Sequence, residues 1–369
     1  MLQRTRSAGY LERIDAQLAD LERKGVRRSV RTESDYAAGK LLDFSSNDYL
    51  GLARHPDLVA ALHDATCAGS GGARLLAGAF PAHRALENEL AEFVGRERAL
   101  LFSSGYHAAL GAIGGIARVV ESCYSDQLNH ACLIDGMRLT RLERTVYPHA
   151  AFARTRGEKS ALVVSETIFG VDGDAIEPSA ILARMDDDDV LLVDEAHALG
   201  VVGEHGGGLA FGIDDPRLVV MGTLSKSFGA HGGFVAGPAK LIEFLQSVAR
   251  SFIFDTALPP AIAEAARAGV RLARAADAER AHLARIGGRL RQRLRAIGYH
   301  VLGEVGAIVP VVIGEVEPTL ALAARLRRAG INAPPIRPPT VPPGTSRLRI
   351  TLRATHTDAD VDQLLEALG

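Results

Sequence analysis

Two stretches decide the fold: Val190-Leu-Leu-Val-Asp194-Glu-Ala-His197 and Leu218-Val-Val-Met-Gly-Thr223-Leu-Ser-Lys226. Each begins with an apolar run of the length of a buried strand and ends in polar residues. Continuous apolar runs are typical of a parallel sheet that is covered on both faces. Ligands of open α/β sheets collect at the carboxyl ends of the strands. The two stretches therefore predict a site at which Asp194, His197 and Lys226 meet.

Each of these three residues, taken singly, has a simpler explanation. A lysine after a strand is usually a solvated loop residue, and an Asp-Glu pair often lies at the start of a helix. Together, at the ends of successive strands, they suit one cofactor. Pyridoxal phosphate needs a lysine for its Schiff base, an acid facing its ring nitrogen and donors for its phosphate. We therefore favour a pyridoxal phosphate site.

Composition narrows the class of protein. The chain has 369 residues, of which 47% are hydrophobic and 23% are charged, as in a soluble globular protein of two domains. The formal net charge of −2 gives no electrostatic reason to expect a nucleic acid or an anionic membrane as partner.

The three cysteines, Cys67, Cys123 and Cys132, lack the spacing of a zinc site or a disulfide framework. We therefore expect no metal and a reducing compartment. The N-terminus lacks the apolar segment of a signal peptide, and no apolar stretch is long enough to span a membrane. The sequence thus predicts a cytoplasmic enzyme.

The order of predicted elements indicates an arm and two domains. Residues 10–30 have the apolar spacing of an amphipathic helix, which places an N-terminal helical arm at 1–40. Strands alternating with helices predict a large, doubly wound α/β domain at 41–255, with strands at 99–102, 160–166, 190–194, 218–221 and 233–237. A smaller α+β domain is predicted at 256–369, and it includes a linking helical stretch at 261–297. We expect the acidic run 186–189 and the arginine-rich faces of residues 265–295 to be solvated.

Further polar residues fall near the predicted strand ends. Gly105-Tyr106 opens a helix, whose free N–H groups and dipole suit a phosphate, although an ordinary strand-to-helix turn explains the pair equally well. Glu166 ends another predicted strand. His130 could stack on a cofactor ring or be an ordinary loop histidine. The glycine-rich segment 69–78 follows a helix rather than a strand, which argues against a dinucleotide-binding loop.

Alternation in Arg347-Leu-Arg-Ile-Thr-Leu-Arg353 places the arginines on one face of a strand. One explanation is a solvated face. The other is that one arginine binds a substrate carboxylate with two parallel hydrogen bonds.

From about residue 41 to the end, the chain resembles the α-oxoamine synthases, which are fold-type I pyridoxal phosphate enzymes. The matching segments are Ser45-Ser-Asn47-Asp-Tyr-Leu-Gly-Leu, Gly69-Ser-Gly-Gly-Ala-Arg74, His83-Arg-Ala-Leu-Glu87, Ser103-Ser-Gly105-Tyr106, Leu128-Asn-His130-Ala, Asp172-Gly-Asp174, Val193-Asp194-Glu-Ala-His197 and Thr223-Leu-Ser-Lys226. The segment Arg337-Pro-Pro-Thr340-Val-Pro is similar to that of the members that join L-alanine to a pimeloyl thioester.

The resemblance implies a role for each matching residue. Lys226 is the Schiff-base lysine, Asp194 faces the ring nitrogen, His197 faces the phenolic oxygen and His130 stacks on the ring. The residues implied around the phosphate are Gly105, Tyr106 and Thr223, with Thr256 reaching the phosphate of a neighbouring subunit. The residues implied for the substrate are Asn47, Arg349, Thr340 and an N-terminal arginine, Arg27 or Arg28.

The resemblance also implies a homodimer and a decarboxylative condensation of L-alanine with pimeloyl-CoA or pimeloyl-acyl carrier protein. A glycine-using member of the family is the nearest alternative, and a nucleotide-binding α/β protein without pyridoxal phosphate is the alternative from another class. Two positions depart from the family pattern: Gly170, where relatives often have serine, and His107-Ala-Ala after Tyr106. Neither departure touches Lys226, Asp194 or His197.

Overall fold

The computed structural model describes residues 9–24, 26–27, 41–155, 157 and 159–369. The chain divides into two compact units, residues 1–41 and 42–369. In the first unit α1 (Tyr10–Arg23) is an amphipathic helix whose large apolar side chains are all exposed. The helix predicted at 10–30 thus ends at Arg23. Arg28 lies outside the described residues.

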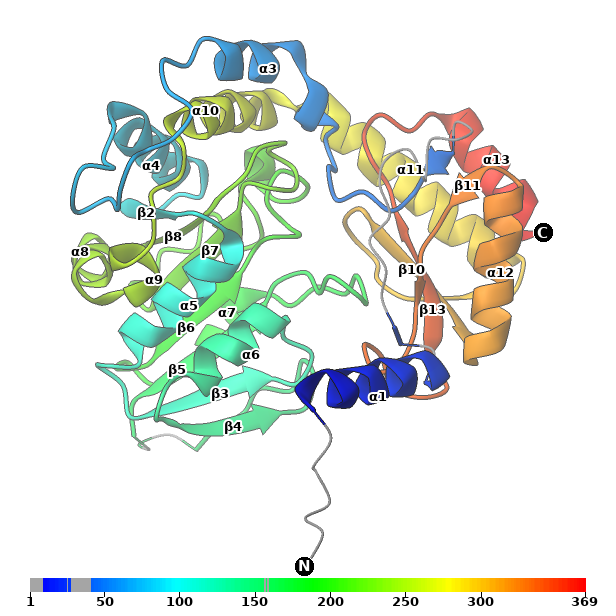
Figure 1. Ribbon diagram of the computed structural model, residues 1–369, viewed down its shortest axis with the longest axis horizontal. Helices are drawn as coiled ribbons and strands as arrows, with labels where there is room; N and C mark the ends of the chain where they lie inside the picture. Colours follow the sequence, from blue (N-terminus) through cyan, green and yellow to red (C-terminus); the bar gives the residue numbers. More distant parts are fainter. Residues whose placement is uncertain (1–8, 25, 28–40, 156, 158) are drawn as a thin grey trace, which may run out of the picture. The chain divides into compact units, whose positions relative to one another are not determined.

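The second unit is built on a seven-stranded sheet (Figure 1). Its strand order is β2 (Arg98–Phe102), β8 (Gly233–Gly237), β7 (Leu218–Thr223), β6 (Val190–Asp194), β5 (Ala161–Glu166), β3 (Ser122–Asp126) and β4 (Glu143–Tyr147). Strands β7, β6, β5, β3 and β4 run parallel, and only β8 pairs antiparallel with both of its neighbours. The expected mostly parallel sheet is therefore confirmed.

Helices cover both faces of this sheet, which explains the continuous apolar runs. In β6, Leu191 and Val193 belong to one hydrophobic core and Leu192 belongs to the other. The first core includes residues of α3 (Pro56–His63), α4 (Pro81–Phe93), α7 (Pro178–Leu182) and α10 (Pro260–Ala275). The second includes residues of α5 (Gly105–Ile116), α6 (Ala131–Arg138), α8 (Ala239–Val248) and α9 (Arg250–Ile253).

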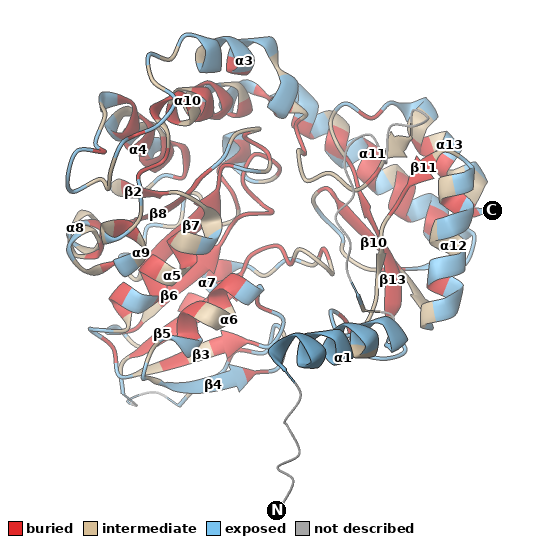
Figure 2. Ribbon diagram, viewed as in Figure 1, coloured by how far each residue is buried: buried red, intermediate tan, exposed pale blue. Residues whose placement is uncertain are grey.

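Strands β3 and β4 lack such apolar runs and were not predicted. Strand β4 lies at the edge of the sheet, and residues 143–146 are exposed (Figure 2). An edge strand that is covered by little else does not need an apolar sequence. The hydrophobic pattern of the sequence therefore does not predict strand β4.

The C-terminal part forms a smaller layer of helices on an antiparallel sheet. That sheet has the order β12 (Pro335–Ile336), β13 (Ser346–Thr351), β10 (Ile308–Gly314) and β9 (His300–Val301). A third core joins it to α11 (Asp277–Ala296), α12 (Val316–Arg328) and α13 (Asp358–Leu368). Residues of β1 (Leu42–Asp43) pair in parallel with β11 (Ile331–Asn332). The helical stretch predicted at 261–297 is two helices, because Ala276 leaves the helical conformation at ψ 41°.

Two expectations of solvated charge are wrong in part. Asp189 is buried and forms an ion pair with Arg154, whose side chain is also fully buried. In α11 the guanidinium of Arg291 is buried and donates hydrogen bonds to backbone carbonyls, including those of Gly303 and Val305. In the part of the chain that the structure describes, no helix has both the length and the apolar character needed to cross a membrane.

Candidate active site

Three strands of the large sheet end side by side in polar residues. Glu166 and Asp194 are the last residues of β5 and β6 and are directly paired in register, and Thr223 ends β7. Because these strands are parallel, their carboxyl ends lie at one edge of the sheet. Lys226 follows Thr223 by three residues, so the same edge receives its amine.

A cavity of about 230 Å³ opens at this edge. Seven residues predicted from the sequence line it: Gly105, Tyr106, His130, Asp194, His197, Thr223 and Lys226. It is also lined by Ser104, Cys132, Glu166, Ala196, Met221 and Ser225. The structure therefore brings together the groups expected to serve one cofactor, places Glu166 from the end of another predicted strand among them, and adds Cys132.

The acidic wall of the cavity is deeply buried. Burial raises the pKa of Asp194, and the neighbouring charge of Lys226 partly opposes that shift. Burial and the charge of Asp194 raise the pKa of Glu166 to about 8. Glu166 accepts hydrogen bonds from the backbone N–H groups of His130, at 2.7 Å, and Gly170, at 3.3 Å. A cation placed against Asp194 would relieve the penalty of burying its carboxylate.

The basic wall holds Lys226 and His197. Lys226 Nζ lies 2.9 Å from His197 Nε2. Burial lowers the pKa of Lys226, and burial together with the charge of Lys226 holds the pKa of His197 well below its usual value. His197 Nδ1 lies 2.5 Å from the hydroxyl of Tyr49. Tyr49 was not singled out from the sequence, although it lies within the segment that contains Asn47.

His130 borders the cavity at the start of α6. It is the N-cap residue of that helix, and its ring Nδ1 accepts a hydrogen bond from the backbone N–H of Cys132 at 3.3 Å. Its Nδ1 also lies 3.0 Å from Cys132 Sγ. Burial lowers the pKa of His130. A neutral, fixed imidazole is suited to stacking on a flat cofactor ring.

The first turn of α5 offers an anion site at the same cavity. Ser104 is its N-cap residue, and Gly105 begins the helix beside Thr223. A side chain at position 105 would press against Thr223 Cβ at 3.1 Å, so glycine keeps this approach open. Hydroxyls of Thr223 and Ser225 lie 2.8 Å apart beside the helix start. Free N–H groups and hydroxyls together form a suitable phosphate cradle.

The two predicted arginines of β13 differ in their partners, and both are buried rather than solvated. Arg347 forms an ion pair with Asp172. Arg349 donates to neutral acceptors: the Gly170 carbonyl at 2.5 Å, Thr351 Oγ1 at 2.8 Å and Asn47 Oδ1 at 3.1 Å. Among the described carboxylates none forms an ion pair with Arg349. Its charge is therefore available to a carboxylate that arrives with a substrate.

The departure at Gly170 has a structural consequence. A Cβ at this position would collide with the ring of His197 at Nε2. The carbonyl of Gly170 also binds Arg349. The expectation that the departure at Gly170 leaves His197 untouched is therefore wrong, because the imidazole occupies the space that a side chain at position 170 would need.

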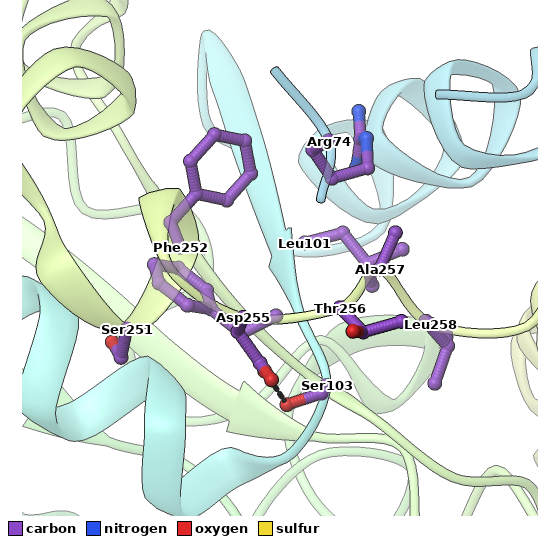
Figure 3. Close-up of a pocket in the computed structure, with 10 residues that line it drawn as sticks. Arg74, Leu101, Ser103, Ser251, Phe252, Asp255, Thr256, Ala257 and Leu258 are labelled. Atoms are coloured by element: carbon purple, nitrogen blue, oxygen red, sulfur yellow. Dashed lines mark hydrogen bonds between the residues drawn. The ribbon is translucent and has the colours of Figure 1, made fainter. Parts of the chain in front are cut away.

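Four predicted residues of the second unit do not line the cavity: Asn47, Thr256, Thr340 and Arg349. Thr340 is exposed, in the turn after β12. Arg27 lies in the first compact unit and pairs with Glu22 at 3.3 Å. Thr256 lines a separate recess of about 10 Å³ with Arg74, Ser103 and Asp255 (Figure 3). The other departure, His107, has its Nδ1 2.6 Å from Ser103 Oγ and 3.1 Å from Asp255 Oδ2, so its ring is held beside this recess.

Comparison with known proteins agrees with this geometry. The family model of class I and II aminotransferases matches residues 39–368. An 8-amino-7-oxononanoate synthase from Anaeromyxobacter dehalogenans is 45% identical, over 98% of this chain and 96% of that protein.

Solved structures extend the comparison. Serine palmitoyltransferase from Sphingomonas wittichii superposes with a TM-score of 0.89 and 32% identity, covering 98% of this chain and 97% of that chain. A structure of SPT with PLP gives a TM-score of 0.88 and 28% identity, covering 97% and 96%. An 8-amino-7-oxononanoate synthase from Francisella tularensis gives 0.78 and 25% identity, covering 89% and 96%.

The matches confirm the expected fold-type I architecture and pyridoxal phosphate as the cofactor. The chain therefore belongs to the class I and II aminotransferase family, in the branch of α-oxoamine synthases that includes the 8-amino-7-oxononanoate synthases.

Proposed function

We propose that this chain catalyses the condensation of L-alanine with a pimeloyl thioester. The products are 8-amino-7-oxononanoate, CO₂ and the free thiol of coenzyme A or of an acyl carrier protein. The new C–C bond joins the alanine Cα to the acyl carbon, and the C–S and Cα–carboxylate bonds break. The relatives at 41–45% identity are named for this product, 8-amino-7-oxononanoate, and we propose that the product serves the synthesis of biotin.

One observation supports the proposal most directly. A lysine amine, an imidazole and two carboxylates converge on one cavity at the strand ends, where burial disfavours the charged form of each. Such a set of strongly shifted, converging groups is typical of a catalytic centre rather than of a structural ion pair.

The residues present fit pyridoxal phosphate. Asp194 would hold its protonated ring nitrogen, and the cation would offset the burial penalty of this carboxylate. His197 would face its phenolic oxygen, and His130 would lie on its ring. The first turn of α5, with Thr223 and Ser225, would hold its phosphate. When bound, the cofactor supplies a sink for the electron pair left at the substrate Cα.

Lys226 is the proposed base at the alanine Cα. It must be uncharged to take a proton, and burial lowers its pKa toward that state. His197 lies 2.9 Å away and orients the amine. A single well-placed base typically contributes about 10²–10⁴-fold to the rate.

Arg349 and Asn47 are the proposed contacts of the alanine carboxylate. The guanidinium is buried, it lacks a carboxylate partner among the described residues, and it is hydrogen-bonded to Asn47. Two parallel hydrogen bonds from Arg349 would fix the orientation of the Cα–H bond as well as bind the substrate. On resemblance alone, Thr340 is proposed to lie near the substrate carboxylate, and Arg27 or Arg28 is proposed to reach the substrate.

We also propose a homodimer in which Thr256 serves the phosphate of the partner subunit. Thr256 lies outside the cavity of its own chain. Two nearby apolar side chains, Leu76 and Phe254, are 82% and 71% exposed, which suits a surface that a second copy covers.

A subunit-mixing experiment tests this arrangement. Co-expressed Lys226→Ala and Thr256→Ala chains form a mixed dimer with one intact site if Thr256 acts across the interface. Cofactor affinity at that site should then equal the wild-type value. If Thr256 acts within its own chain, no site of the mixed dimer is intact. An active monomer in sedimentation would contradict the homodimer itself.

The substrate assignment is tested by a thiol-release assay. Alanine, glycine and serine are each combined with acetyl, pimeloyl and palmitoyl thioesters of coenzyme A, and the pimeloyl group is also supplied on acyl carrier protein. We expect release with alanine and a pimeloyl donor only. Preference for glycine with a short acyl group would favour the glycine-using alternative. Preference for serine with palmitoyl-CoA would favour the activity named for the structural neighbours.

A further inference from the structure

Tyr49 is a buried polar residue that the proposed mechanism does not use. It lies in the loop after β1, and its side chain is fully buried. Burial raises the pKa of Tyr49 to about 12, so the phenol keeps its proton at neutral pH. Its oxygen lies 2.5 Å from His197 Nδ1 and 3.2 Å from Asn47 Oδ1. The single hydroxyl proton can therefore point toward either of two acceptors.

The imidazole of His197 can likewise carry its proton in either of two positions. Its low pKa makes the imidazole neutral, and a neutral imidazole has one proton, on Nδ1 or on Nε2. Nδ1 faces Tyr49 and Nε2 faces Lys226, at 2.5 Å and 2.9 Å. The hydroxyl that touches Nδ1 thus decides which nitrogen carries the proton.

The distances favour one of the two arrangements. A distance of 3.2 Å from Tyr49 to Asn47 is long for a hydroxyl donor, whereas 2.5 Å to His197 lies at the short end of the usual range. Asn47 Oδ1 also accepts a hydrogen bond from Arg349 Nη2 at 3.1 Å. It does not depend on Tyr49 for a donor. The tyrosine proton therefore points to His197 Nδ1.

We propose that Tyr49 is a positioning residue that keeps the proton of His197 on Nε2, which faces Lys226 and would face the phenolic oxygen of the cofactor when it is bound. The inference rests on the proposed role of His197, but not on the identity of either substrate. An N–H donor at Nε2 stabilises negative charge on that oxygen. With the proton on Nδ1 instead, Nε2 would present a lone pair to it and the stabilisation would be lost.

The first test is a pH titration of the visible absorbance of the holoenzyme without substrates. Tyr49→Phe removes only the hydroxyl. Loss of this donor would make the phenolic oxygen of the bound cofactor more basic, so the Lys226 nitrogen would keep its proton to higher pH. We expect the midpoint to rise by about one pH unit.

Tyr147→Phe is the matched control, because Tyr147 is also buried, its hydroxyl donates to the Val164 carbonyl at 3.4 Å, and it does not line the cavity. It should leave the midpoint unchanged. An unchanged midpoint in Tyr49→Phe, or an equal shift in both variants, would overturn the proposal.

A double-mutant cycle separates a positioning role from a general structural one. In a His197→Gln background, Tyr49→Phe should no longer move the midpoint, since Tyr49 acts through the imidazole. A shift of the same size in that background would contradict the proposal.

A measurement on the unaltered protein gives an independent answer if Tyr49→Phe folds poorly. Proton-coupled ¹⁵N spectra of histidine-labelled holoenzyme should place the His197 proton on Nε2, with the signal identified by its loss in His197→Gln. A proton on Nδ1 would refute the inference. These measurements use no thioester and no amino acid, so failure of the proposed synthesis in the thiol-release assay leaves them unaffected.

Discussion

Two clusters of charged side chains, one buried and one only partly buried, differ in the direction of their pKa shifts. At the cavity, burial moves each pKa toward the neutral form: Lys226 and His197 are lowered, and Glu166 is raised to about 8. The second cluster is His149 between two aspartates, with Nδ1 3.0 Å from Asp126 and Nε2 bound to Asp174. Its hydrogen bonds to Asp126 and then to Asp174 raise the pKa of His149 to about 10.

The difference lies in the partners. His149 meets two carboxylates in good geometry, so the charged form is favoured despite burial. The cavity groups are left without such compensation, which is unfavourable for folding and persists where the groups serve a ligand. Removing a charge at the cavity should therefore reduce activity with little loss of stability. Removing the charge of His149 should do the reverse.

The largest effect is expected from Lys226→Ala. Because the base at Cα is lost, synthesis should fall to the background of the assay. The melting temperature of the cofactor-free protein should not fall, since no carboxylate among the described residues is hydrogen-bonded to the lost amine. Borohydride reduction of the wild-type holoenzyme followed by peptide mapping should find the pyridoxyl group on Lys226. Finding it on another lysine would contradict the assignment.

Asp194→Asn should have the next largest effect. The substitution keeps the shape of the side chain and removes the charge that would face the ring nitrogen. We expect exchange of the alanine Cα proton, measured without an acyl donor, to slow on the order of 10²–10³-fold, the usual effect of removing one electrostatic contact in a buried site. Exchange at the wild-type rate would exclude the proposed role.

Two substitutions on one strand sharpen the comparison further. Arg349→Lys keeps the charge but loses the paired hydrogen bonds. It should raise the alanine KM and lower kcat, with a loss of about 2–4 kcal/mol in kcat/KM. Arg347→Lys is the matched control, because Arg347 is already bound to Asp172. If Arg347→Lys damages alanine kinetics as much or more, the substrate arginine has been misassigned.

The large sheet and the centre of its site could be predicted from sequence for one reason. Strands covered on both faces need apolar runs, and the parallel arrangement brings their carboxyl ends together. Asp194, His197 and Lys226 follow directly from those runs. The edge strand β4 does not, because exposure removes the apolar signal.

Contacts between segments that are distant in the sequence could not be predicted from hydrophobic runs. Tyr49 reaches His197 across 148 residues of sequence, from a loop whose position is set by tertiary packing. In the same way, an acidic run such as 186–189 has the composition of a solvated loop. Only the fold brings Arg154 to Asp189 and makes that aspartate a buried partner. A charged residue in a sequence does not show whether the fold will place an oppositely charged side chain beside it.

The smallest effect is expected from His149→Gln, which tests the paired cluster. The folded pKa of about 10 lies above the unfolded value near 6.5, so the charged pair stabilises the fold fully below pH 6.5. That stabilisation declines as the pH rises and is gone above about pH 10. We expect the variant to lose about 2 kcal/mol of unfolding free energy at pH 6 and much less at pH 9.5, with nearly normal kinetics.

His356 is a suitable contrast, because burial lowers its pKa to about 4. The neutral ring of His356 contributes fully to the free energy of unfolding above pH 6.5, and this contribution is lost as the pH falls toward 4. Urea unfolding of His149→Gln and His356→Gln from pH 4 to pH 10 measures the loss of unfolding free energy in each variant. This loss should decrease with rising pH for His149→Gln and increase with rising pH for His356→Gln. If the two losses changed with pH in the same way, the carboxylate partners of His149 would not distinguish it from buried groups that have none.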